Sequence, residues 1–260
     1  MSTRSSAANV RVCFLLLITG ALLTVTNVSA QVQVAPLAPK WLAGTPTPPV
    51  ETFADGLTRH HIPLTETALI AALANSDPEV RSLAAAQLAA MDDHQALPAI
   101  IDALEAESDI QVQVNLAGAA TWLDSRRALE KLQQLCQNQN VPATARLDAA
   151  RYVSNKDLPT CFSVVEQVEQ SAQDADIRIL ALEAAVNYRG QADRAQALAI
   201  SALGDLDPTV RIAAVEALQA LHATGAVDTL ARALPTEGDI TVREHMREAI
   251  RALQHTDTPH

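Results

Sequence analysis

The chain has 260 residues and a formal net charge of −11; 48% of its residues are hydrophobic, but only 3% are aromatic. A negative field of this size repels nucleic acid and anionic membrane surfaces, so we expect neither as a partner and expect any charged partner to be basic. Because aromatic side chains are scarce, Ala, Leu and Val must form the core, which favours closely packed helices over a β-sandwich.

The first thirty residues have the three-part pattern of a secretory signal peptide. Arg4 and Arg11 precede the apolar run VCFLLLITGALLTV, and small residues lead up to Ala30. The apolar run is shorter than the ~20 residues that a membrane-spanning helix needs. We therefore expect cleavage after Ala30 and export to the bacterial periplasm. The alternative is an uncleaved segment, which would then be the membrane contact of the chain.

Residues 31–52 are rich in proline and are predicted to form an extended linker. Trp41 lies alone in this segment, where it could dock on the rest of the chain, contact a partner or stay free. A different pattern begins at residue 53 and continues to residue 254. The polar tail, residues 255–260, is predicted to be disordered.

Two similar stretches, DPEVRSLAAAQLAAM and DPTVRIAAVEALQAL, reveal an internal repeat. When the chain is aligned on the Arg of this motif, equivalent positions recur every 32 or 33 residues. These positions are Arg81, Gln113, Arg146, Arg178, Arg211 and Arg243. Four residues earlier stand Asp77, Asp109, Pro142, Asp174, Asp207 and Asp239. A Val/Ile/Ala column directly before the Arg keeps the same step, so the chain is a repeat array.

The residue type of each column is explained if a helix begins just after the Asp. The Asp side chain can accept hydrogen bonds from the free amides of the first turn. Apolar residues stand one position before the Arg and three, four and seven positions after it, which is one face of a helix. A second helix follows each first helix, with predicted starts near Ala96, Arg127, Cys161, Arg194 and Ala226. A half unit from Thr65 precedes the array, and a last helix runs from Asp239 to about Leu253.

These motifs resemble HEAT repeats, in particular the short bacterial HEAT-like repeats of the phycobiliprotein-lyase type, over about residues 65–254. The resemblance implies an all-α fold, a right-handed α-solenoid of about five to six helix-turn-helix repeats with the second helices on its concave side. It also implies that the Asp and Arg columns bond along the stack. Gln113 and Pro142 are expected to interrupt that ladder in the second and third units.

No motif for catalysis, metal binding or cofactor binding is present, and we expect none of these. His60 and His61 are adjacent, and adjacent histidines rarely bind one metal ion unless distant ligands join them. Export favours a disulfide between Cys136 and Cys161. Against it, ten residues of helix rise would separate the thiols by ~15 Å if successive second helices were parallel. The sequence leaves this pairing open.

Carboxylates gather on the predicted second helices, where they could line a groove for a basic or cationic protein segment. The ordinary alternative is a solvated polar face. The candidate partner-binding residues are Asp102, Glu105, Glu130, Glu166, Glu169 and Asp228. Trp122, at the end of a first helix, is expected to anchor the core or a turn.

The leading functional hypothesis is a non-enzymatic scaffold for protein–protein interaction. The alternative is a lyase-like or cofactor-maturation factor that acts on a small-molecule or chromophore ligand. A passive structural role in an envelope complex is a third possibility.

Overall fold

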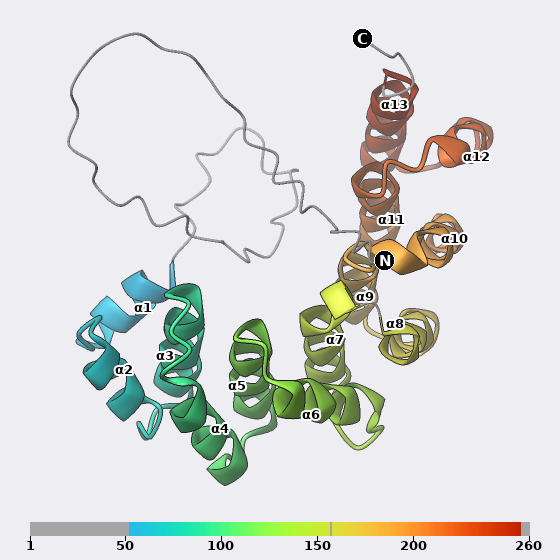
Figure 1. Cartoon of the computed structure of the whole chain (residues 1–260). Coiled ribbons are helices and arrows are strands. Elements are labelled where there is room, and N and C mark those ends of the chain that lie inside the picture. Colours follow the sequence, from blue (N-terminus) through green and yellow to red (C-terminus); the bar gives the residue numbers. More distant parts are fainter. Residues whose placement is uncertain (1–51, 157, 256–260) are drawn as a thin grey trace, which may run out of the picture. The chain divides into compact units, whose positions relative to one another are not determined.

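A computed structural model describes residues 52–156 and 158–255, which form helices and no strand (Figure 1). The predicted signal peptide, the predicted linker up to residue 51 with its Trp41, and residues 256–260 of the predicted tail lie outside the described residues. The prediction of disorder was wrong for His255, which ends the last helix. The first helices of the repeats are α3 (Pro78–Ala90), α5 (Ile110–Trp122), α7 (Ala143–Tyr152), α9 (Ala175–Ala185), α11 (Pro208–Ala220) and α13 (Ile240–His255). The second helices are α4 (Leu97–Ala106), α6 (Arg126–Gln137), α8 (Pro159–Ser171), α10 (Ala192–Ala202) and α12 (Val227–Ala233). The predicted all-α solenoid is therefore confirmed.

The first helices form the spine of the array, because each packs against the next from α3 to α13. Their facing sides carry the small residues that the repeat pattern predicted. Ala84, Ala117, Ala149, Ala181 and Ala214 are each completely buried. Alanine lets two helix backbones approach closely, so much of the space between successive first helices is filled by small side chains.

The Asp column caps the first helices, as predicted. Asp77, Asp109, Asp174, Asp207 and Asp239 each accept a hydrogen bond from the backbone N–H two residues later, at 2.8–2.9 Å. Helix α7 is the exception, because its N-cap residue is Pro142 and makes no side-chain cap. The aspartates therefore serve their own helices.

The arginines bond along the stack, but not to the aspartate column that the resemblance implied. Arg81 donates from Nε and Nη2 to the two carboxylate oxygens of Glu107, at 2.6 and 3.1 Å. Arg178 binds Asp205 in the same way, and Arg211 binds Glu237. Each of these three acids stands two residues before the cap Asp of the next unit and accepts the N–H of that Asp. We call these three ion pairs the arginine ladder.

The ladder is interrupted in the second and third units, as predicted. The amide of Gln113 donates to the Glu107 carbonyl at 2.8 Å. Arg146 is 8% exposed and donates from Nε to the Cys136 carbonyl at 3.1 Å. At the position where Arg146 would find its acid, the chain has Ala172. Thus Ala172, rather than Pro142, removes the ion pair of the third unit.

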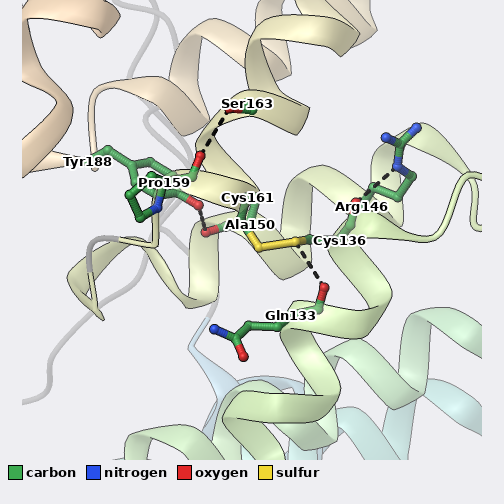
Figure 2. The surroundings of a disulfide bond; sticks show 8 residues. All are labelled: Gln133, Cys136, Arg146, Ala150, Pro159, Cys161, Ser163 and Tyr188. Atoms are coloured by element: carbon green, nitrogen blue, oxygen red, sulfur yellow. Dashed lines mark hydrogen bonds between the residues drawn. A yellow bond between two sulfur atoms is a disulfide. The ribbon is translucent and has the colours of Figure 1, made fainter.

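A disulfide joins Cys136 and Cys161, with Cα atoms 5.9 Å apart (Figure 2). The helix-rise argument against this bond was wrong because α6 and α8 are strongly inclined to each other (Figure 1), so the end of α6 meets the start of α8. The disulfide therefore connects the second unit to the third, where Gln113 makes no ion pair.

The next junction is closed by an aromatic contact. The Tyr188 hydroxyl donates to the Ala150 carbonyl at 2.6 Å, as Figure 2 shows, and the Tyr188 ring meets Phe162 edge-on at 5.2 Å. The Arg194 guanidinium lies 4.8 Å above the Phe162 ring. These contacts tie α7 and α8 to the following unit, where Arg146 has no acid.

Two features at the ends of helices were not anticipated. Helix α1 (Phe53–Arg59) precedes α2 (Glu66–Ala72), the predicted half unit, and has a capping box between Thr52 and Asp55. That T-x-x-D signal was visible in the sequence. Trp122 is 49% exposed, so it does not anchor the core, and the alternative that it anchors a turn stays a prediction.

Removing the disulfide should destabilise the chain. The bond closes a separation of 25 residues, for which loop-closure entropy corresponds to about 3.5 kcal/mol. We expect the Cys136→Ser/Cys161→Ser protein to lose about that much free energy of unfolding in urea titrations. Equal stability of the two proteins under oxidising conditions would contradict the assignment.

Adding the missing acid should stabilise the chain. Ala172 and Glu107 are both helix C-cap residues with similar backbone angles, φ −68° and ψ 131° against φ −77° and ψ 135°. We expect Ala172→Glu to pair with Arg146 and raise the free energy of unfolding by about 0.5–1 kcal/mol. The gain should be absent in Ala172→Gln and in an Arg146→Gln background. A gain that persists there would show that no ion pair forms.

Candidate functional site

Hollows lie beside the second helices, among which α6 and α8 are in closer contact than the rest. A hollow of about 480 Å³ lies between α2 and α4. Its lining includes Ile70, Leu73, Ala99, Ala103 and Ala106. Arg81, Asp102 and Glu107 also line it, and we call it the α2–α4 hollow. A smaller hollow, of about 310 Å³, lies beside Ala233 and Met246.

Two of the predicted partner-binding residues are exposed and in no salt bridge among the described residues. Asp102 lines the α2–α4 hollow. Asp228 is exposed in the first turn of α12. The structure therefore places an available carboxylate beside the apolar floor of the larger hollow.

Three other predicted residues are neutralised by arginines. Glu105 of α4 pairs with Arg127 of α6, and Glu130 pairs with Arg126 at 3.1 Å within α6. Glu166 of α8 accepts two hydrogen bonds from Arg194 of α10, at 2.5 and 3.1 Å. In Figure 1 these helices follow one another along the array. Since three of the six acids have an arginine partner, the six do not form one uniformly acidic surface.

Glu169 is 5% exposed and cannot contact a partner, so its place among the candidate residues was wrong. It points from α8 into the core, at the repeat position that Leu104 and Cys136 occupy in other units. Burial raises the pKa of the Glu169 carboxyl, the nearby Asp205 charge raises it further, and Arg178 lowers it. The helical period alone did not distinguish this inward position from the outward ones.

Residues 66–153, from α2 to the end of α7, match the family model for HEAT repeats. Residues 66–153 of this chain are therefore HEAT repeats. HEAT repeats commonly mediate protein–protein interaction. The matched residues of this chain include the whole lining of the α2–α4 hollow. No functionally curated protein matches the chain.

Among solved structures, the chain is similar to human deoxyhypusine hydroxylase in complex with glycerol. The two share 18% sequence identity, with a TM-score of 0.41 and 73% of each chain covered. A likeness this distant carries no argument about activity. Within the described residues, none of the HEAT-repeat helices combines the length and hydropathy needed to cross a bilayer.

Sequence reasoning found the acids of the HEAT repeats but missed the hollow. The half unit was predicted only as the front of the array. No pattern in the sequence indicates the space between α2 and α4, because that space depends on how the two helices pack.

Neutralising the buried carboxylate should stabilise the fold. Because the folded-state pKa of Glu169 is raised, burial of its charge costs stability above that pKa, and the cost disappears as pH falls through it. We expect Glu169→Gln to raise the free energy of unfolding by about 1 kcal/mol near neutral pH and by less in acid. Glu166→Gln, which loses the Arg194 pair, should destabilise instead. Urea titrations at about pH 7 and pH 4 test this, and a gain that grows in acid would contradict it.

Proposed function

We propose that this HEAT-repeat protein is exported to the bacterial periplasm and is a non-enzymatic scaffold that holds a protein partner on its second helices. The observation that carries this proposal is the α2–α4 hollow, which combines an apolar lining with the exposed carboxylate of Asp102. Apolar surface with a few polar groups at its edge is the usual composition of a protein-binding surface. A helix or extended segment with one apolar anchor would fit between the two helices.

Two further observations support parts of this proposal. The disulfide between Cys136 and Cys161 is of the kind that persists in oxidising compartments, which supports export. The net charge of −11 favours a partner with a basic segment. Since Glu105, Glu130 and Glu166 are paired with arginines, Asp102 is the group we assign to the basic residue of that segment.

The lyase-like or maturation-factor alternative needs a pocket that holds a chromophore or another small molecule. The α2–α4 hollow is open, and no aromatic side chain lines it. Aromatic faces are the usual means of holding a flat conjugated ligand. The scaffold therefore remains the better-supported function of this surface.

An affinity purification from cell-envelope extract tests the scaffold. The matched variants are Ala106→Arg, which places a cation in the α2–α4 hollow, and Ala220→Arg, at the end of α11. Both alanines are exposed and end a helix, so the two variants carry the same change at different surfaces. We expect a near-stoichiometric protein to be retained by the wild type and Ala220→Arg, and lost from Ala106→Arg and at high salt.

Equal retention by both variants would remove the hollow from the proposal. A chain that copurifies with a light-absorbing small molecule and no protein would overturn the scaffold in favour of the maturation-factor alternative. The absorbance spectrum of the eluate distinguishes these outcomes.

A further inference from the structure

Three side chains with metal-binding atoms converge where α1 meets the start of α3. His60 is the C-cap residue of α1, Asp77 is the N-cap residue of α3, and Glu79 lies in the first turn of α3. The His60 Nε2 atom is 3.5 Å from a Glu79 oxygen, and Nδ1 is 3.7 Å from an Asp77 oxygen. One ligand atom from each residue can be chosen so that all three lie within 4.8 Å of one another.

The backbone explains why His60 rather than His61 takes this place. His61 has a left-handed conformation, with φ 57°, which reverses the chain after α1. The side chain of His60 is then directed to α3 and is only 26% exposed, whereas His61 is exposed to solvent. The adjacent histidines therefore have different environments, and only one of them meets the distant ligands that a metal site requires.

Each carboxylate has one oxygen directed to His60. The Asp77 Oδ1 atom caps α3 by accepting the Glu79 N–H at 2.9 Å, which leaves Oδ2 on the imidazole side. The Glu79 Oε1 atom is 3.5 Å from Arg59, which leaves Oε2 on the imidazole side. Asp77 Oδ2 and Glu79 Oε2 thus both approach the imidazole ring.

One imidazole nitrogen and two carboxylate oxygens are a donor set that Zn²⁺ accepts. In a tetrahedral site with bonds of about 2.1 Å, neighbouring ligand atoms lie about 3.4 Å apart. One ligand atom from each residue already lies within 4.8 Å of the other two, so small side-chain rotations would bring the three atoms to that spacing. We propose that His60, Asp77 and Glu79 form a divalent-metal site that binds zinc, with solvent completing the coordination. This site is independent of the α2–α4 hollow and of the scaffold proposal.

A bound ion would tie α1, which precedes the half unit, to the first full repeat. Helix α1 has only seven residues and packs on α3. A helix this short is marginal without tertiary contacts, so an ion shared by the two elements would stabilise the start of the array. The positive charge of Arg59 beside Glu79 opposes a cation, and we therefore expect micromolar rather than tighter affinity.

The same three groups could also form ion pairs around a protonated imidazole and bind no metal. Zinc titration separates the two arrangements. The full chain, stripped of metal with a chelator that is then removed, is titrated with zinc in competition with a chromophoric chelator, and its thermal unfolding midpoint is measured with and without zinc.

We expect one saturable equivalent of zinc, and a rise in the unfolding midpoint. His60→Asn and Glu79→Gln should each weaken binding by about tenfold or more and abolish that rise. His61→Asn is the matched control, because Asn tolerates the left-handed turn, and its affinity should stay within about twofold of the wild type. Equal zinc affinity in His60→Asn, or no saturable binding up to about 1 mM zinc, would overturn the site and leave the ion-pair arrangement.

Discussion

The structure depends on how each unit is joined to the next. A single helix pair cannot bury its apolar face alone, so a solenoid is stable only if every junction is closed. At three junctions an arginine reaches back to the carbonyls that precede its own helix and forward to an acid that stands two residues before the cap Asp of the next unit. These arginines are mostly shielded from solvent, with side chains 16% exposed, so each ion pair is little weakened by water.

The two middle junctions show that other chemistry can take over the same task. Where Gln113 makes no ion pair, a disulfide connects α6 to α8. Where Arg146 meets Ala172, the Tyr188 hydroxyl and the Phe162 ring bridge the units. Covalent and aromatic contacts are therefore concentrated in the middle of the array. There α6 and α8 are in contact, whereas hollows remain between second helices elsewhere.

The charged side chains divide into those that stabilise the fold and those that face a surface site. Much of the acidity of the chain caps helices, completes the arginine ladder or pairs with arginines on neighbouring second helices, so a net charge of −11 does not produce one acidic groove. Asp102 faces the α2–α4 hollow, and the second oxygens of Asp77 and Glu79 face His60. The proposed partner surface and the proposed metal site both use acids at the N-terminal end of the array.

The sequence by itself determined the repeat period, the first and second helices, the aspartate caps and the buried alanine columns, because these depend on spacing within one helix or one turn. Tertiary structure alone decided the acids of the arginine ladder, the disulfide, the inward position of Glu169 and the approach of His60 to α3. Each of these depends on the inclination of one helix to another, which the packing of many side chains sets together. The assumption of parallel second helices failed at Cys136 and Cys161 for that reason. The spacing of residues within one helix does not determine the angle between that helix and another.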